Sequence, residues 1–488
     1  MTSQSADTER RVSTGVPGGD DILNRGYLPE TATLVRGAPG TGKSIFSLHF
    51  LAAGLDTGES GLYINLGEPE DYIRDTARHF GFDIDALQFL DLSASGDEFQ
   101  SEETYTLFES GAVETPSLVD NIRTEIREID PDRVVVDPVT EFRYLTPDDH
   151  QFRSQILSLV NFLKTEGATV LLTSQTADSM PDDDLQFLVD AVINLENDRD
   201  RRTIHVSKFR GSSVRSGPHT LQITDDGMRV WPQLDPNRHS RERPPERLSS
   251  GVPELDSLLS GGLTAGTITF LSGPTGVGKT TTGLQFLTEA AGRGQHSVLY
   301  SFEENKHTLF QRAEAVNIPI TDMVDRGMIQ VEIIGPGELT VDEFTHRIRA
   351  EVEDDDAAFV MIDGTSGFEQ SLRGVSEDPI QDLVRIGRYL RNMGVTGLIT
   401  NEVHQITGEF RATDQGMSYL ADNIVILRHV EYGGSLRKVI GVLKMRTSNY
   451  ENQLRDLEIT EHGLRVGESL PELRGILTGT PAWDDDDA

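Results

Sequence analysis

Two kinds of apolar pattern alternate along the chain. Short, nearly continuous apolar runs are typical of strands buried on both faces, and longer stretches with a helical apolar spacing are typical of amphipathic helices. Strands and helices that alternate in this way predict an α/β fold with a mainly parallel central sheet, because parallel strands need a crossover between them. In the first half of the chain these segments are residues 31–37, 45–55, 61–66, 133–138, 156–167 and 169–175.

The same pattern occurs twice. The segment STGVPGGDDIL begins at Ser13 and returns as SSGVPELDSLL at Ser249, a separation of 249 − 13 = 236 residues. A repeat that spans nearly a whole domain predicts two copies of one domain, with the register kept between them. The same separation relates Gly37 to Gly273, Lys43 to Lys279, Glu68 to Glu304 and Lys208 to Lys444.

The length of the chain agrees with two domains. Its 488 residues exceed what one hydrophobic core usually serves. We expect a first domain at 10–235 and a second at 247–470, joined by a Pro-rich and Arg-rich linker at 236–246. Residues 1–9 are expected to be a flexible start, and residues 471–488, which carry a run of aspartates, an acidic solvated tail.

Each copy carries a glycine-rich loop between an apolar strand and a helix. The segments GAPGTGKS and GPTGVGKT both fit the P-loop pattern, in which two glycines are followed by a lysine and a hydroxyl residue. Glycines let backbone N–H groups converge on phosphate oxygens, the lysine reaches the outer phosphates, and the hydroxyl ligates Mg²⁺. We therefore predict that both copies bind ATP with Mg²⁺. The nucleotide-binding residues are expected to be Gly37, Pro39, Gly40, Thr41, Gly42, Lys43 and Ser44, and Gly273, Thr275, Gly276, Val277, Gly278, Lys279 and Thr280.

An aspartate at the end of a later apolar run completes each predicted metal site. Asp137 ends the run in RVVVDP, and Asp363 ends the run in AFVMID. Aspartates at strand ends are also common in turns, so this interpretation depends on the neighbouring P-loops. With them, Ser44 and Asp137 are expected to hold Mg²⁺ in the first copy, and Thr280 and Asp363 in the second.

Hydrolysis also needs a carboxylate that orients or deprotonates the attacking water. The second copy offers Glu303 and Glu304 in YSFEE, and the first offers only Glu68, because Gly67 precedes it. Glutamates at such positions can instead cap the following helix. Beside a P-loop, we expect Glu68, Glu303 and Glu304 to be catalytic, together with Lys43 and Lys279.

The composition narrows the class of partner. Acidic residues number 80 and basic residues 44, which gives a formal net charge of −36. Such a surface repels polyanions, which argues against nucleic acid as a partner, and it is typical of proteins from a salt-rich cytoplasm, so we expect a halophilic source. The chain has no cysteine, no signal sequence and no apolar run of about 18 residues, so we expect a cytoplasmic protein without membrane contact.

These segments resemble the KaiC family of tandem RecA-fold ATPases, which is typified by circadian clock proteins. The likeness rests on SGVPELDSLL, YSFEE, IDGTS, the KMR triplet, and the closing ITEHGLRV and LTGTP, and it covers nearly the whole chain. It implies two RecA-like domains and a signalling ATPase that forms a homo-hexameric double ring, with nucleotide between subunits and unidentified signalling partners. In such a ring a Lys-x-Arg pair reaches the neighbour's ATP, which the resemblance assigns to Lys208 and Arg210, and to Lys444 and Arg446.

The resemblance also implies Ser/Thr autophosphorylation in the second domain. The matching stretch is RATDQGMSYLADNIVIL, in which Thr413 and Ser418 fall on acceptor positions. Tyr419 replaces the threonine of the family, so the paired acceptor pattern is broken. The first copy has Gln186 and Phe187 at the corresponding places, so any autokinase activity is expected in the second copy, with Glu303 as a candidate base.

Two other classes of function remain open at this point. One is a RecA-type ATPase that interacts with DNA, since the fold alone does not decide the function. The acidic composition argues against it. The other is a nucleotide-gated scaffold with negligible turnover, whose partners read its conformational state.

Overall fold

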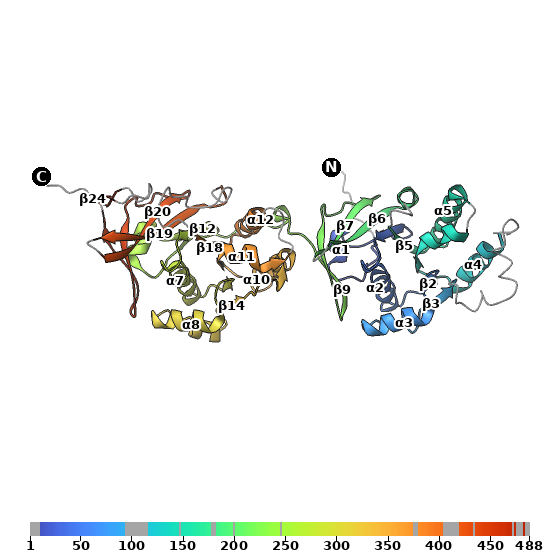
Figure 1. Cartoon of the computed structure of the whole chain (residues 1–488), viewed down its shortest axis with the longest axis horizontal. Helices are drawn as coiled ribbons and strands as arrows, with labels where there is room; N and C mark the ends of the chain where they lie inside the picture. The colour runs from blue at the N-terminus through green and yellow to red at the C-terminus, as the bar shows by residue number, and fades with distance from the viewer. Residues whose placement is uncertain are drawn as a thin grey trace, which may run out of the picture. The chain divides into compact units, whose positions relative to one another are not determined.

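The computed structural model describes residues 10–92, 116–145, 148–176, 182–198, 201–244, 246–373, 379–403, 419–432, 435–470, 473–474 and 482–483. The chain divides into two compact units, Met1–Gln233 and Leu234–Ala488 (Figure 1). Among the described residues, no helix is both long enough and apolar enough to cross a membrane.

The first unit is built on a nine-stranded sheet with the order β3-β2-β4-β5-β1-β6-β7-β8-β9. The strands from β3 to β6 run parallel, and those from β6 to β9 form antiparallel pairs. The strands are β1 Ala32–Gly37, β2 Gly61–Asn65, β3 Gln88–Asp91, β4 Arg133–Asp137, β5 Thr169–Gln175, β6 Ala191–Asp198, β7 Arg201–Phe209, β8 His219–Thr224 and β9 Gly227–Trp231. The helices are α1 Gly19–Ile22, α2 Lys43–Leu55, α3 Glu70–His79, α4 Pro116–Ile129, η3 Val139–Leu145, α5 Asp149–Thr165 and η4 Leu185–Phe187.

The second unit repeats this sheet in the order β14-β13-β16-β18-β12-β19-β20-β21-β22. The prediction of two α/β domains with mainly parallel sheets is thus confirmed. The strands of this sheet are β12 Ile268–Gly273, β13 Ser297–Ser301, β14 Ile329–Ile333, β16 Phe359–Asp363, β18 Thr396–Glu402, β19 Asn423–Tyr432, β20 Ser435–Met445, β21 Arg455–Thr460 and β22 Gly463–Ser469. The helices are η5 Pro236–Arg238, α6 Pro253–Leu258, α7 Lys279–Gly292, α8 Lys306–Ala315, α9 Ile320–Asp325, α10 Val341–Glu353, α11 Thr365–Ser371 and α12 Pro379–Asn392. Short two-stranded ladders add β10 Arg247–Leu248 with β11 Leu263–Thr264, and β15 Leu339–Thr340 with β17 Leu372–Arg373.

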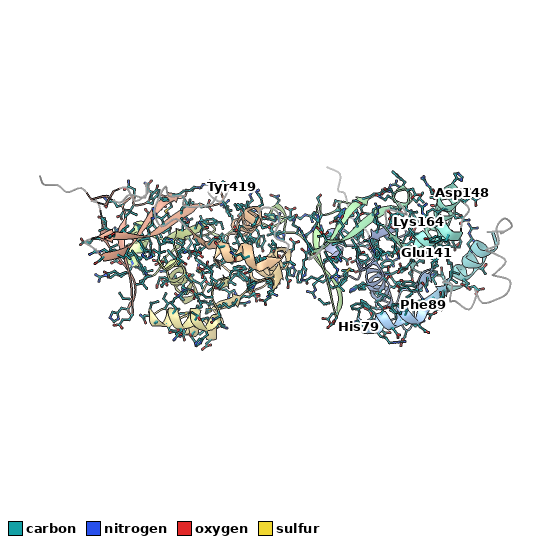
Figure 2. The ribbon with its side chains drawn as sticks, viewed as in Figure 1. His79, Phe89, Glu141, Asp148, Lys164 and Tyr419 are labelled. Atoms are coloured by element: carbon teal, nitrogen blue, oxygen red, sulfur yellow. The ribbon has the colours of Figure 1, made fainter. Side chains whose placement is uncertain are left out.

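Both faces of each sheet are covered, which explains the continuous apolar runs. In β12, Phe270 packs into the core on one face of the sheet and Leu271 into the core on the other. Successive side chains of a strand point to opposite faces, so a strand with two buried faces must be apolar throughout. Side-chain caps fix several helix starts; the Asp148 carboxylate, for example, accepts from the Gln151 N–H at 2.8 Å where α5 begins (Figure 2).

The register between the two copies is not constant. β4 and β16 occupy the same place in their sheets, yet Asp137 and Asp363 at their ends are 363 − 137 = 226 residues apart. The separation of 236 returns at Lys208 and Lys444 because length differences between the copies cancel. The expectation of one unbroken register is therefore wrong in the middle of the repeat, although the strands correspond one to one.

The segment predicted as a linker, 236–246, packs against the second unit. Leu234, just before it, is buried in the core of that unit. The His239 ring meets the Tyr389 ring edge-on at 5.3 Å, and the Arg243 guanidinium lies 2.7 Å from the Asp356 carboxylate. These contacts attach the described part of the segment to the second domain.

The end of the chain contains one more ladder. Leu473–Arg474 (β23) pairs antiparallel with Ala482–Trp483 (β24), inside the stretch 471–488 that is predicted to be an acidic tail.

Candidate nucleotide-binding and catalytic sites

Each P-loop joins the central strand of its sheet to a helix, β1 to α2 and β12 to α7. Gly42 and Gly278 precede the helices with φ values of 101° and 111°, a region that favours glycine. A Cβ atom on Gly278 would also lie 2.4 Å from Cδ1 of Ile459. The loop therefore brings its backbone N–H groups to the start of a helix, where the helix dipole favours an anion.

The P-loop lysines lie inside their own loops. The Lys43 ammonium donates to the carbonyls of Gly37 at 2.9 Å and Ala38 at 3.0 Å. Lys279 makes the same pair of hydrogen bonds, at the same distances, to Gly273 and Pro274. Burial lowers the pKa of both lysines, and nearby carboxylates oppose this effect. Each loop thus holds a cation at its centre, in the geometry that binds outer phosphates.

The remaining residues of the two P-loops differ in how exposed they are to solvent. Pro39, Gly40, Thr275 and Gly276 are exposed at the loop tips. Val277, in contrast, is fully buried in the hydrophobic core. Its side chain is therefore unavailable to a ligand, and only its backbone N–H can serve the predicted role. Thr41, at the same position of the first loop, donates its hydroxyl to the Ala38 carbonyl at 2.9 Å.

In the second unit the predicted metal ligands lie in direct contact. The Thr280 hydroxyl donates to Oδ1 of Asp363 at 3.0 Å, and the Thr400 hydroxyl donates to the same oxygen at 2.8 Å. The other oxygen of Asp363, Oδ2, is buried and accepts no hydrogen bond from the described residues. Burial raises the pKa of Asp363. An uncompensated buried carboxylate oxygen beside a hydroxyl fits a hard cation such as Mg²⁺.

In the first unit a tyrosine stands between the corresponding groups. The Tyr63 hydroxyl donates to Oδ2 of Asp137, and the Thr173 hydroxyl donates to Oδ1. Burial, and then the charge of Asp137, raise the pKa of Tyr63 well above its ordinary value, so the phenol stays protonated and donates. A side-chain interaction with Ser44 acts on the Tyr63 hydroxyl and lowers the pKa of the phenol. Ser44 and Asp137 are therefore connected through Tyr63.

No described group of three or more His, Cys, Asp or Glu side chains is arranged to hold a metal ion.

The two neighbouring glutamates of the second unit have different surroundings. Glu303 lies directly against the backbone after Asp363, because a Cβ atom on Gly364 would come within 2.6 Å of its Cγ. Partial desolvation, and then the charge of Asp363, raise the pKa of Glu303, whereas Lys279 lowers it. Glu304 instead forms an ion pair with Arg312 of α8. Of the two glutamates, Glu303 is therefore the one that lies close to Asp363 and Lys279.

Neither of these glutamates caps the following helix. Asn305 is the N-cap of α8 and accepts from the Thr308 N–H at 2.9 Å. In the first unit, Glu68 precedes Pro69, which is the N-cap of α3, and no side chain caps this helix. Partial desolvation, and then the charge of Asp137, raise the pKa of Glu68. The capping alternative therefore does not account for any of the three.

The Lys-x-Arg pairs lie away from the P-loop of their own unit, with the lysines on β7 and β20 and the arginines just after these strands. Lys208 donates to the carbonyls of Gln186 at 2.7 Å and Val189 at 2.6 Å, and Lys444 donates to Ala421 at 2.7 Å. Each lysine therefore ties down the segment before the neighbouring strand, β6 or β19. The arginines that follow, Arg210 and Arg446, are exposed.

The proposed acceptor residues Thr413 and Ser418 lie outside the described residues. Tyr419, which follows them, is 44% exposed (Figure 2), and its counterpart Phe187 is 73% exposed. In the first unit the stretch before Phe187 is anchored by ion pairs, Arg36 with Asp182 and Arg143 with Asp184.

Sequence reasoning missed four side chains that contact the predicted site residues: Tyr63, Thr173, Arg312 and Thr400. Thr173 and Thr400 could have been found from the sequence, because TVLLTSQ and TGLITNE each place a threonine near the end of the strand that lies beside the Asp-bearing strand. No repeated pattern points to Tyr63 or Arg312, since each occurs in only one copy.

A phosphate-binding loop after a central parallel strand, with an aspartate at the end of a neighbouring strand, defines a P-loop nucleotide-binding domain, and this chain has two in tandem. The sequence model described as "ATPase: KaiC" matches residues 12–235 and 248–470. The chain therefore belongs to the KaiC family of ATPases.

Curated relatives match the chain over nearly its full length. The circadian clock oscillator protein KaiC of Synechococcus elongatus is 29% identical over 99% of this chain and 94% of its own length. The oscillator protein KaiC of Thermosynechococcus vestitus is 29% identical over 98% and 93%. The circadian clock protein KaiC3 of Synechocystis is 27% identical over 99% and 97%. The similarity thus includes both domains.

Proposed function

We propose that both domains bind and hydrolyse Mg-ATP and that the chain is a signalling ATPase. The observation that carries this proposal is the arrangement of the second unit, where Thr280 contacts Asp363 and Glu303 lies against the backbone that follows Asp363. Magnesium, held by Thr280 and Asp363 in the second unit and by Ser44 and Asp137 in the first, would neutralise charge on the phosphates. The same donor types in both copies support one reaction.

The side chains of the second unit have separate tasks in this reaction. Lys279, at the centre of the loop, stabilises charge on the outer phosphates. Glu303 orients the attacking water and takes its proton, which its raised pKa favours. Arg312 holds Glu304 in place and keeps a second carboxylate next to Glu303. In the first unit, Glu68 takes the part of Glu303.

A second candidate activity is autophosphorylation in the second unit, with Ser418 or Thr413 as the acceptor. The acceptor hydroxyl attacks the γ-phosphorus, the bond from that phosphorus to the β–γ bridging oxygen breaks, the proton passes to Glu303, and ADP leaves. The observation that favours it is that Glu303 exists only in this copy, while Gly67 occupies the corresponding place in the first.

We also propose that the active form is a homo-hexameric double ring with nucleotide at subunit interfaces. Arg210 and Arg446 support this, because they are exposed and lie just after β7 and β20, which are not the strands that lead into the P-loops. A cation from a neighbouring subunit could then stabilise the transferring phosphoryl group, a contribution worth about 10³ to 10⁵ in rate. The clock proteins named above suggest signalling partners for the ring.

One experiment separates these activities. The wild-type chain and the Glu303→Gln and Glu68→Gln variants are incubated with Mg-ATP at high salt, and released phosphate and phosphopeptides are measured together. We expect Glu303→Gln to abolish phosphate on Ser418 and Thr413 while hydrolysis by the first unit continues, and Glu68→Gln to do the reverse.

Other results would select another class. ATP consumption without any modified residue removes the autokinase activity. Bound ATP without turnover in the wild type leaves a nucleotide-gated scaffold. Turnover that rises several-fold with single-stranded DNA identifies a RecA-type DNA-dependent ATPase.

A further inference from the structure

Tyr63 distinguishes the two metal sites. It belongs to β2, and its neighbour across the parallel ladder with β4 is Val135. In the second unit, Leu299 of β13 takes this place, with Met361 of β16 as its neighbour. Leucine has no hydroxyl, so only the first unit carries a donor between the P-loop hydroxyl and the aspartate.

This donor changes which atoms of the aspartate are available. Both carboxylate oxygens of Asp137 accept a hydrogen bond, one from Tyr63 and one from Thr173. Asp363 accepts both of its hydrogen bonds from described residues on Oδ1, and its buried Oδ2 accepts none. The second unit therefore presents a carboxylate oxygen without a partner, and the first unit does not.

The tyrosine ring is held in place from its other side. It stacks on Phe89 of β3 with 5.6 Å between the ring centroids and 20° between the planes. The Arg74 guanidinium lies 4.4 Å from the centroid of the Phe89 ring. The Tyr63 side chain is fully buried, so its hydroxyl has little freedom to leave Asp137.

We propose that Tyr63 is a positioning residue that weakens magnesium binding in the first unit, so that the first site needs more Mg²⁺ than the second. Asp137 must give up its hydrogen bond from Tyr63 to contact the ion through that oxygen, whereas Asp363 offers an oxygen without a partner among the described residues. The two sites then load at different Mg²⁺ concentrations. This inference rests on the proposed Mg-ATP binding by both units.

The test measures binding of a fluorescent ATP analogue as Mg²⁺ is added, with the full chain and no turnover readout. The Lys279→Ala background reports the first site. We expect Tyr63→Phe to lower the Mg²⁺ concentration at half-saturation by about threefold to tenfold, since one hydrogen bond to the carboxylate is removed. Affinity for the analogue in the presence of a chelator should stay the same. Phenylalanine keeps the ring that stacks on Phe89.

Tyr27→Phe is the matched control. Tyr27 is also a buried tyrosine of the first unit, and its hydroxyl has no hydrogen-bond partner among the described residues. Its removal should leave the Mg²⁺ dependence unchanged. A Tyr63→Phe curve that coincides with that of the parent, or that moves to higher Mg²⁺, overturns the proposal.

A second comparison needs no change at Tyr63. The Lys279→Ala chain, which reports the first site, should need more Mg²⁺ for half-saturation than the Lys43→Ala chain, which reports the second. Equal or reversed requirements contradict the proposal. If the first site binds no nucleotide at any Mg²⁺ concentration, the proposed function itself fails there, a result distinct from binding with unchanged metal dependence.

Discussion

Glu303 and Glu304 are adjacent in the chain, but their side chains have different contacts. Glu304 is paired with Arg312, and Glu303 lies against the backbone that follows Asp363. A carboxylate near another carboxylate, partly removed from water, holds its proton to higher pH. The different roles follow from these contacts and not from the residue type.

We therefore predict that replacing Glu303 lowers the hydrolysis rate of the second unit and changes how that rate depends on pH. In a Lys43→Ala background, Glu303→Gln should lower the hydrolysis rate by about 10² to 10⁴. The raised pKa of Glu303 should place the acid limb of the parent's pH–rate profile above that of an ordinary glutamate, and the variant should lose this limb. Steady-state phosphate release from pH 4.5 to 8 measures both. Glu458 is exposed on β21, so Glu458→Gln is the control and should change neither.

His49 in α2 makes a second prediction at this scale. It is held neutral, because its Nε2 accepts from the Met228 N–H at 2.7 Å and its Nδ1–H donates to the Gly15 carbonyl at 3.1 Å. Burial lowers the pKa of His49 to about 4. The folded state therefore binds a proton on His49 less readily than the unfolded state does. The neutral ring contributes its full stability above pH 6.5, the ordinary pKa of histidine, and this contribution is lost as the pH falls from 6.5 towards 4.

The lowered pKa of His49 corresponds to about 3 kcal/mol of folding free energy at most. Gln285 stands at the corresponding position of the second unit, so His49→Gln is a natural replacement. We expect this variant to be less stable than the parent at pH 7.5 but to lose less stability between pH 7.5 and 5. Calorimetry of the full chain checks this. If the stability of the variant depends on pH in the same way as that of the parent, His49 does not contribute to the pH dependence and the prediction is wrong.

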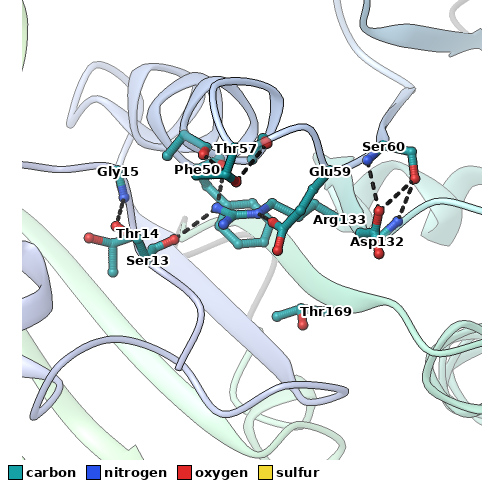
Figure 3. A network of polar contacts seen from close by, with 12 residues as sticks. Ser13, Thr14, Gly15, Phe50, Thr57, Glu59, Ser60, Asp132, Arg133 and Thr169 are labelled. Atoms are coloured by element: carbon teal, nitrogen blue, oxygen red, sulfur yellow. Dashed lines mark hydrogen bonds and ion pairs between the residues drawn. The ribbon is translucent and has the colours of Figure 1, made fainter. Parts of the chain in front are cut away.

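At the scale of elements, Arg133 joins three segments of the first unit. Its guanidinium donates to the carbonyls of Ser13 at 2.9 Å and Phe50 at 2.6 Å, and to the Glu59 carboxylate at 2.6 Å (Figure 3). These contacts connect the segment before α1, the P-loop helix α2 and the start of the strand that carries Asp137. In the second unit Phe359 has this position and is buried in the apolar core.

Arg133→Ala should destabilise the first unit by about 3 to 5 kcal/mol, because the change leaves Glu59 and two carbonyls without their partner. Urea unfolding measures it. Arg78→Ala, which breaks an exposed pair with Asp75, is the control and should cost less than about 1 kcal/mol. A loss as small as that of the control would mean that Arg133 contributes little beyond its packing.

At the scale of the whole molecule, the net charge of −36 sets the response to salt. Like charges on a compact surface repel one another, and salt screens them over about 10 Å at 0.1 M but only about 3 Å at 1 M. We predict that the melting temperatures of both units rise between 0.1 M and 2 M KCl, as expected for a halophilic protein. Calorimetry with and without KCl tests this. Melting temperatures that stay constant or fall would contradict the prediction.

Much of the fold could be predicted because the signals are local or repeated. The apolar runs at 31–37 and 133–138 became β1 and β4, and the repeated loops became the starts of α2 and α7. The predicted linker was a different case, since its Pro and Arg content gave no sign that His239 and Arg243 contact Tyr389 and Asp356. Such contacts join residues more than 100 positions apart, and composition carries no record of them.

The sequence by itself determined the two P-loops, the aspartates after β4 and β16, and the alternation of strands and helices. Each of these depends on residue types at fixed short spacings, which backbone geometry converts directly into structure. Only the tertiary structure decided that Glu303 lies against the backbone after Asp363 while Glu304 pairs with Arg312, and that Tyr63 interacts with both Ser44 and Asp137. These contacts depend on which strands become neighbours, and the order of the strands in the sheet determines that.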